Sequence, residues 1–335
     1  MTDAATQRAI DAHVHWFPPS YYTFLSKRGV EPRAEFADGR WSYLNGGRSI
    51  RSMSPEWFDL DMHYETAART GRDMTLVTSM GVHGDLDGLP AAEAKEAARM
   101  INEEWSAAQQ RHAGCFFAAA AVPLVDTGAA IEEATHAVNT LGLRGISLPS
   151  SIAGEPIDAP RFEPFYSCCE ALGVPLFLHP IDSALLDAMA GYNGRLHASL
   201  GRVCDSSMAV MRLIFSGTLD RHSNLKLLHF HAGGVLPYAA GRLDKNASIP
   251  GIEEQPTEYL RRMWVDTAMP HSLTIGMAIE FYGPDRVLYG SDNPCWNPLA
   301  ALQATEALHL DESVMTAVMV DNAERFIDLR VPAAV

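Results

Sequence analysis

The chain has 335 residues, and its acidic composition excludes two broad classes of protein. It carries 26 Lys and Arg against 41 Asp and Glu, a formal net charge of −15 at pH 7. A nucleic-acid scaffold or a membrane-surface protein needs a basic face to meet phosphate groups, so we expect no nucleic acid and no membrane as partner. Hydrophobic residues make up 47% of the chain, which is typical of a folded, enzyme-sized protein.

The chain also lacks the sequence signals of membrane insertion and export. No apolar run reaches the roughly 18–20 residues that a spanning helix needs. The first eight residues, MTDAATQR, contain no basic segment followed by an apolar one. The cysteines form no CxxC pair; they are Cys115, Cys168, Cys169, Cys204 and Cys295. We therefore expect reduced thiols and a cytoplasmic location.

Eight short apolar runs recur in chain order, and amphipathic segments of helical length separate them. The runs are 8–14, 73–79, 115–122, 143–148, 174–179, 225–231, 262–267 and 285–291. The clearest helical segments are 91–112, 127–141, 161–172 and 205–217. Alternating strands and helices predict parallel strands with helical crossovers, and eight such units predict a closed (β/α)8 TIM barrel, an α/β fold. No low-complexity linker divides the chain, so we expect residues 1–335 to form a single barrel domain.

Two connections exceed the about 2–6 residues that are typical of a βα loop. They span 16–56 and 180–203, and the second contains Gly191, Gly194 and Gly201. Both follow a predicted strand, which places them at the C-terminal face, where barrel enzymes build their active sites. We interpret both as lid or substrate-pocket insertions; surface elaboration is the alternative.

Four of the eight predicted strands end in residue types that bind metals. The strand ends read Asp11-Ala12-His13-Val14-His15, His179-Pro180, HFHAGG over 229–234 and GSDNP over 290–294. Because residues i and i+2 of a strand face the same side, His13 and His15 can both point into the barrel mouth. Three imidazoles and one carboxylate that converge there form a ligand set for a borderline cation such as Zn²⁺, with a position left for water or substrate.

These motifs resemble those of the amidohydrolase superfamily, and within it the decarboxylase branch typified by aminocarboxymuconate-semialdehyde decarboxylase. The matching segments are IDAHVHWFP at 10–18, LHP at 178–180, 226–234, 241–242 and 288–294. The resemblance extends over 8–327, nearly the whole chain. It implies that His13, His15, His179 and Asp292 bind the metal. It also implies that His231 acts on the substrate or on metal-bound water, and that Asp292 takes part in proton transfer.

The resemblance further implies how a carboxylate substrate is held. Its arginines correspond to Arg51 in the first insertion, with Arg48 as the alternative, and to Arg242 after the sixth strand. Arg242 would reach the site of a neighbouring subunit, so we expect a homodimer or a higher homo-oligomer. Trp296, which follows the eighth strand, is a further candidate for substrate binding. With Trp16, Phe17 and Trp41 it suggests a flat aromatic or unsaturated acid.

The fourth strand bears on the number of metal ions. Binuclear members of the superfamily carry a lysine at its end, which bridges two metals once it is carbamylated. Here the segment 145–149 reads GISLP. We therefore expect one divalent ion, Zn²⁺ or Mn²⁺. The chain departs from the family pattern at Ala232, where a glycine is usual, and at Asn293, where this branch often has a tyrosine.

The activity implied by the resemblance is metal-dependent decarboxylation of an aromatic or unsaturated carboxylic acid. The same residues suit a hydrolase or hydratase that acts on a lactone, an amide or an unsaturated acid, and fold and ligands do not separate the two. A non-enzymatic binding protein on the same barrel is a third interpretation. His229, on the sixth predicted strand, is expected to be a core residue rather than a ligand.

Overall fold

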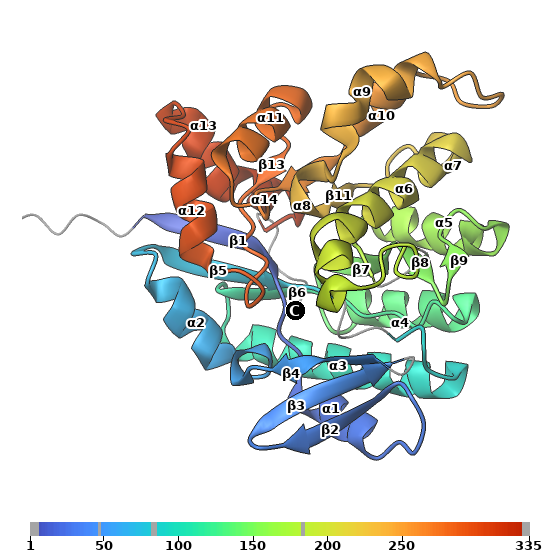
Figure 1. Ribbon diagram of the computed structural model, residues 1–335, viewed down its shortest axis with the longest axis vertical. Coiled ribbons are helices and arrows are strands. Elements are labelled where there is room, and N and C mark those ends of the chain that lie inside the picture. Colours follow the sequence, from blue (N-terminus) through green and yellow to red (C-terminus); the bar gives the residue numbers. More distant parts are fainter. Residues whose placement is uncertain (1–6, 46–47, 82–85, 182–184, 330–335) are drawn as a thin grey trace, which may run out of the picture.

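The computed structural model describes residues 7–45, 48–81, 86–181 and 185–329, except for the side chains of residues 48–52. Eight parallel strands form one sheet in chain order (Figure 1). They are β1 (Arg8–Val14), β5 (Asp73–Thr78), β6 (Phe116–Ala120), β7 (Gly145–Pro149), β10 (Leu176–His179), β11 (Leu227–His229), β12 (Trp264–Asp266) and β13 (Val287–Leu288). This arrangement confirms the predicted eight-stranded α/β barrel.

The segment after the last strand closes the barrel against the first strand. Val14 and Asn293 form a parallel bridge. The amide of Asp292 donates to the carbonyl of His13 at 2.7 Å, and the amide of His15 donates to the carbonyl of Asn293 at 2.8 Å. The backbone hydrogen bonds that close the barrel therefore belong to residues that were predicted as metal ligands and to their neighbours.

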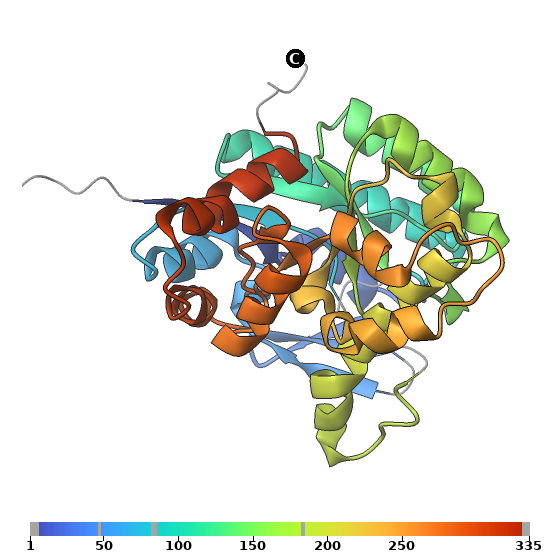
Figure 2. The ribbon, with the colours of Figure 1, turned by 90° about the horizontal axis from the view of Figure 1, so that it is seen from above.

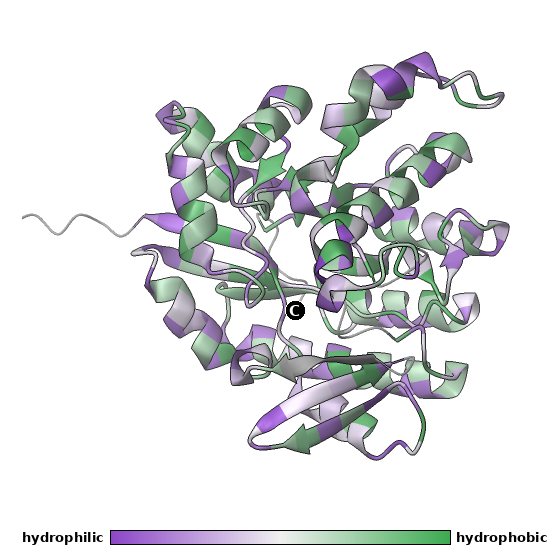
Figure 3. Cartoon of the chain, in the orientation of Figure 1, coloured by the Kyte–Doolittle hydropathy of each residue, from purple (hydrophilic) through white to green (hydrophobic). Residues whose placement is uncertain are grey.

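Helices cover the outside of the barrel (Figures 1 and 2). The longer ones are α2 (Leu60–Ala68), α3 (Ala91–Arg111), α4 (Thr127–Asn139), α5 (Glu163–Leu172), α6 (Arg202–Phe215), α9 (Leu236–Lys245), α11 (Ser272–Tyr282) and α12 (Pro298–Glu306). The shorter ones include α7 (Thr218–Arg221), α10 (Pro256–Arg262) and α13 (Glu312–Thr316). The segment α8 (Phe230–Gly233) is a buried turn after β11, and α14 (Asn322–Phe326) packs against the barrel core. In Figure 3 the helices show both hydrophobic and hydrophilic colour, as one-sided burial requires.

The barrel interior is a packed core. Side chains from alternate strand positions contact one another there, among them Ile10, Val77, Phe177 and Leu288, and Phe326 of α14 packs against them. This filling matches TIM barrels generally, whose interior is closed by side chains and whose open end carries the site. Among the described residues, none of the helices combines the length and the apolar character that crossing a lipid bilayer requires.

The first long connection folds into a small unit of its own. It contains α1 (Pro19–Ser26), an antiparallel sheet of β2 (Arg33–Ala37), β3 (Arg40–Asn45) and β4 (Arg48–Met53), and a short 3₁₀ helix, η1 (Pro55–Trp57). Tyr22 and Tyr43 are fully buried and pack together. Figure 1 shows this sheet beside the barrel, next to α3.

The second long connection becomes helical in its later part, after a described turn over residues 185–191. A 3₁₀ turn, η3 (Tyr192–Gly194), and a π-helical stretch, η4 (His197–Gly201), lead into α6. The helix predicted over 205–217 therefore begins earlier, at Arg202. Figure 2 shows this stretch in olive, projecting beyond the rest of the chain.

Candidate metal centre

Four buried side chains converge at the C-terminal ends of the strands. One possible ligand atom from each of His13, His179, His231 and Asp292 lies within 4.8 Å of the others. His15 adjoins them, because its Nε2 lies 3.1 Å from Nε2 of His13 and 3.1 Å from Oδ1 of Asp292. The structure thus brings together the four predicted ligands and His231, the predicted catalytic histidine.

His13 is held by a carboxylate on its far side. Its Nδ1 lies 2.6 Å from Oδ2 of Asp266, and the ring of Phe230 stacks on it with centroids 3.7 Å apart. An ionised carboxylate only accepts hydrogen bonds, so Nδ1 carries the proton and Nε2 presents its lone pair to the cluster. Our sequence interpretation missed Asp266. The available signal was an acidic residue near the end of the seventh apolar run, at the same edge as the other candidates.

Backbone carbonyls fix the other two imidazoles. Nδ1 of His15 lies 3.1 Å from the carbonyl of Ser79, and Nδ1 of His179 lies 2.7 Å from the carbonyl of Pro180. Carbonyls also only accept, so both rings in their neutral form carry the proton on Nδ1 and a lone pair on Nε2. Trp57, at the end of the first insertion, stacks on His15 with an interplanar angle of 6° and fixes its plane.

This donor set fits a divalent cation. Nε2 of His13 and Nε2 of His15 face each other at 3.1 Å with no proton to share. Nε2 of His179 and Oδ1 of Asp292 are buried and have no hydrogen-bond partner among the described residues. Lone pairs that face one another in a buried site repel unless a cation lies between them, and buried polar atoms normally find a partner. Neutral imidazoles with one carboxylate are ligands for such an ion.

Burial and mutual contact set the charge states in the cluster. Burial lowers the pKa of His13, although the nearby carboxylates oppose it, and burial with the neighbouring imidazoles holds the pKa of His179 well below its usual value. Burial alone would raise the pKa of Asp292, but contacts with His13, His15 and His231 hold it well below its usual value. The pKa shifts therefore favour an ionised Asp292 beside neutral imidazoles at His13 and His179.

Two of the cluster residues lie on left-handed turns. His231 and Asp292 have φ values of 60° each, an uncommon conformation for residues other than glycine. The sixth predicted strand, 225–231, is therefore too long: β11 ends at His229, and the chain turns at His231 instead of continuing as extended strand. Asp266 stabilises this turn as well, because its Oδ1 accepts from the amide of Ala232 at 3.0 Å. His229 is fully buried and pairs with Ser206 at 3.0 Å, as a core residue does.

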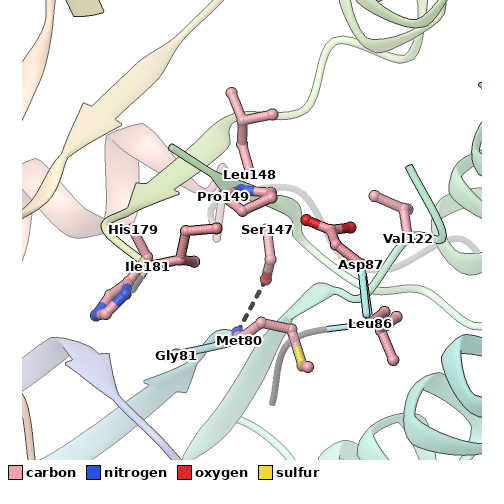
Figure 4. A pocket seen from close by; sticks show the side chains of 10 residues that line it. All are labelled: Met80, Gly81, Leu86, Asp87, Val122, Ser147, Leu148, Pro149, His179 and Ile181. Carbon is pink, nitrogen blue, oxygen red and sulfur yellow. Dashed lines mark hydrogen bonds between the residues drawn. The ribbon is translucent and has the colours of Figure 1, made fainter. Parts of the chain in front are cut away.

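Two hollows flank the cluster. A cleft of about 1450 Å³, its open mouth included, is lined by His231, Asp292 and Trp296 among others. A much smaller cavity, with about 30 Å³ of space for a water-sized ligand, lies beside His179, and Figure 4 shows its mostly apolar lining with Asp87 and Ser147 as the other polar side chains. A ligand that enters the cleft therefore meets His231 and Asp292.

The predicted substrate-binding residues are distributed unevenly. Trp296 lines the cleft, whereas Arg242 is exposed on α9 and is not part of the cluster. Arg51 lies in β4 at the point where its pairing with β3 shifts register, and the side chains of Arg48 and Arg51 lie outside the described residues.

The other aromatic residues predicted for the pocket serve the core instead. Phe17 is fully buried and stacks on Trp57, and Trp16 is buried against Phe116. Trp41 packs against Phe36 inside the first insertion. Aromatic composition alone does not distinguish a pocket from a core.

Comparisons with known proteins agree with this geometry. A family model described as Amidohydrolase matches residues 10–329. The chain is 25% identical to a 2-amino-3-carboxymuconate-6-semialdehyde decarboxylase of Dictyostelium discoideum, over 96% of this chain and 91% of that protein. It is 31% identical to a gamma-resorcylate decarboxylase of Rhizobium radiobacter, over 71% of this chain and 77% of that protein.

A solved structure shows the same fold. It is a dihydroxybenzoic acid decarboxylase of Polaromonas sp. JS666 with bound manganese and the inhibitor 2-nitroresorcinol. It superposes with a TM-score of 0.75 at 20% identity and covers 98% of each chain. The resemblance predicted from the strand-end motifs is thereby confirmed. Since the family model matches nearly the whole chain, the protein belongs to the amidohydrolase family.

Proposed function

We propose that the protein is a metal-dependent decarboxylase of an aromatic or unsaturated carboxylic acid. The observation that carries the proposal is the buried donor set of His13, His15, His179 and Asp292, whose lone pairs face one another at the open end of the barrel. The named activities of the relatives at 25% and 31% identity supply the reaction class. The hydrolase or hydratase that the sequence left open has no separate support in the site.

One divalent metal ion would be held by these four residues, with Zn²⁺ as our first choice and Mn²⁺ as the alternative. When bound there, it supplies a Lewis acid for the oxygens of a substrate. Asp266 and the carbonyls of Ser79 and Pro180 orient the three imidazoles from behind. Such outer partners normally matter to metal affinity almost as much as the ligands themselves.

His231 and Asp292 are our candidates for the proton transfer. Loss of carbon dioxide leaves an electron pair on carbon, and that carbon must then take up a proton. Nε2 of His231 lies 3.5 Å from Oδ2 of Asp292, and both residues line the cleft. A histidine beside a carboxylate is suited to hold a proton and to donate it to a nearby carbon.

Substrate binding would draw on the cleft and on a second subunit. Trp296 presents an aromatic face to the cleft, and Arg51 and Arg242 would bind the substrate carboxylate by paired hydrogen bonds. Arg242 is exposed on α9 one turn after Tyr238, which is 87% exposed. An exposed tyrosine beside an arginine is typical of an interface, so the working unit would be a homodimer or higher homo-oligomer.

We also propose that residues 1–335 work as one barrel domain in the cytoplasm. The segments 16–56 and 180–203 would shape the substrate pocket or cover it. In the described part of 180–203, the lining of the cleft supports this role, because Arg195, Ala198 and Ser199 contribute to it.

The test is metal content together with carbon dioxide release. We expect about one Zn²⁺ or Mn²⁺ per chain in the wild type, which Asp292→Ala loses, since a mononuclear site needs its carboxylate. Asp158→Ala, which removes a carboxylate that pairs with Arg212 at 2.7 Å far from the cluster, is the control and keeps the metal. The metal-loaded protein should release carbon dioxide from ortho-hydroxybenzoates or muconate-type acids. Two metals per chain, or bound metal with turnover of lactones only, would favour the hydrolase.

A further inference from the structure

The wall of the cleft carries two arginines that neither the sequence motifs nor the proposed function uses. Arg195 and Arg202 line the same cleft as His231 and Asp292. Arg195 is exposed and Arg202 is half-buried. His231 and Asp292, which form the floor of the cleft, are buried. A ligand that reaches from the floor to the mouth would therefore meet guanidinium groups along its way.

Both arginines lie on one face of a continuous helical stretch. The residues Arg195, Ala198, Ser199 and Arg202 all line the cleft, and the steps of three residues from Arg195 to Ala198 and from Ser199 to Arg202 are each close to one helical turn. The stretch passes through η4 into α6 with helical backbone angles at Gly201 and Arg202. The two guanidinium groups thus project from a single rigid element.

Hydrogen bonds connect this element to the floor of the cleft. Ser206 of α6 pairs with Nε2 of His229 at 3.0 Å, and the hydroxyl of Ser207 accepts from the amide of Val235 at 3.0 Å. These partners lie two residues before and four residues after His231. The position of Arg202 relative to His231 is therefore set by the fold and not by a mobile loop.

The charge of the cleft is opposite to the charge of the chain. Among the described residues that line the cleft, Asp292 is the sole carboxylate. Arg195 and Arg202 are its positively charged side chains, and His271 lines it as well. The chain as a whole carries −15. A local reversal of this kind attracts anions to one place, because the field in a low-dielectric cleft depends on its own charges.

We propose that Arg195 and Arg202 bind a second, non-reacting acidic group of the substrate. The reacting carboxylate must lie at the floor, where its carbon is within reach of His231 and Asp292, so it does not also occupy the wall. The substrate would then be an aromatic acid with at least two anionic groups. This inference rests on the proposed function and narrows its substrate class.

Binding of matched ligands tests the inference without turnover. Calorimetry on metal-loaded His231→Asn protein, which lacks a proposed proton donor, compares salicylate with 3-, 4- and 5-carboxysalicylate, which differ from it by one carboxylate, and the arginine variants are made in the same background. We expect at least one dicarboxylate to bind about tenfold more tightly or better, as a charge-assisted hydrogen bond predicts. Arg195→Gln and Arg202→Met should each lower this affinity ratio several-fold, and the double variant should bring it near one.

A control variant and a separate measurement of carbon dioxide release distinguish failure of this inference from failure of the proposed function. Arg212→Gln removes an arginine of the same helix that pairs with Asp158 outside the cleft, and it should leave the ratio unchanged. Arg195 is exposed, so Arg195→Gln keeps the fold even if Arg202→Met does not. No preference for any dicarboxylate, or a preference that Arg195→Gln leaves intact, overturns the inference. Carbon dioxide release from monocarboxylates with no such preference would leave the proposed function standing. An arginine-dependent preference without any decarboxylation would leave the inference standing alone.

Discussion

The floor of the cleft and its wall are built in different ways. At the floor the side chains are buried, and partners from other strand ends orient two of the histidines: Asp266 holds His13, and the carbonyl of Ser79 holds His15. On the wall, Arg195 is exposed and Trp296 is 49% exposed, and both belong to segments that follow the strands. The positions of the floor residues therefore depend on closure of the barrel, whereas the positions of the wall residues depend on the segments that follow the strands.

This difference separates the determinants of chemistry from those of specificity. A change at the floor leaves a buried polar atom without its partner, which costs free energy in every state of the protein. A change on the wall alters the contact with a ligand and leaves the barrel intact. We therefore expect floor variants to lose stability or metal, and wall variants to lose affinity only.

The largest effect is expected for Gly234→Ala, at the turn that carries His231. Gly234 has φ of +62°, and a Cβ there would clash with the hydroxyl of Ser207 and lie 2.8 Å from the carbonyl of Val203. Overpacking costs about 1–3 kcal/mol, and the backbone at Gly234, with φ of 62° and ψ of −131°, is a conformation that residues with a Cβ almost never adopt, which adds about 1–3 kcal/mol. The free energy of unfolding, measured by denaturant titration, should fall by this sum.

Gly241→Ala on α9 is the matched control, because nothing lies within 4 Å of a Cβ at that position. It should stabilise the protein by up to about 1 kcal/mol, since alanine is the better helix former. Equal effects of the two substitutions would show that the turn adapts freely and that the floor is less rigid than the structure indicates.

The positions of the floor residues could be predicted well, because the ends of the strands can be recognised in the sequence. Apolar runs located all eight strands, and His13, His15, His179 and Asp292 lie at or just after the ends of those runs, where the family resemblance implied metal ligands. What it could not predict is the left-handed backbone at His231, because hydrophobic periodicity carries no information on a positive φ.

The wall was harder to predict for a different reason. The second insertion contains Gly191, Gly194 and Gly201, which suggest a loop, yet 192–215 is helical almost throughout. Gly191 and Gly194 do have positive φ values, as in a turn, whereas Gly201 lies inside the helical stretch despite its low helix propensity, so that Arg195 and Arg202 belong to one helical segment. The stacking of Trp57 on His15 is likewise a long-range contact without any local signal.

A second prediction concerns His63 of α2, which lies behind the floor. His63 is buried, and burial lowers its pKa to about 4. The unfolded chain binds this proton below its usual pKa of about 6.5, and the folded chain does not, so stability is lost as pH falls from 6.5 to 4. Between pH 7 and 4, in the presence of a chelator, the unfolding free energy of the wild type should fall by about 3 kcal/mol more than that of His63→Gln. Parallel curves would show that His63 is protonated in the folded protein too.

A third prediction concerns Asp266→Asn. Oδ1 of Asp266 accepts from the amides of Ala232 and Ala268, at 3.0 and 3.2 Å, while Oδ2 faces Nδ1 of His13. The amide of asparagine has one oxygen and one NH₂ group, so its NH₂ must face either Nδ1–H of His13 or the backbone amides at the His231 turn. One of these two hydrogen-bonding interactions is therefore lost. Metal affinity, measured by competition with a chelating dye, should fall about 10- to 100-fold. Asp158→Asn should leave it unchanged, and an unchanged affinity in Asp266→Asn would mean that His13 needs no carboxylate behind it.

The smallest effect is expected on the wall, for Trp296→Ala. Trp296 lines the cleft beside Asp292 but is half exposed, so its removal leaves no buried cavity. An aromatic contact contributes about 0.5–1.5 kcal/mol, so the dissociation constant of an aromatic acid should rise by up to about tenfold. Metal content and the free energy of unfolding should stay at wild-type values, as they should in Tyr192→Ala, which removes an exposed aromatic side chain that does not line the cleft. If Trp296→Ala instead lost metal, the residues after β13 would position Asp292 through their side chains, and the distinction between floor and wall would fail at that point.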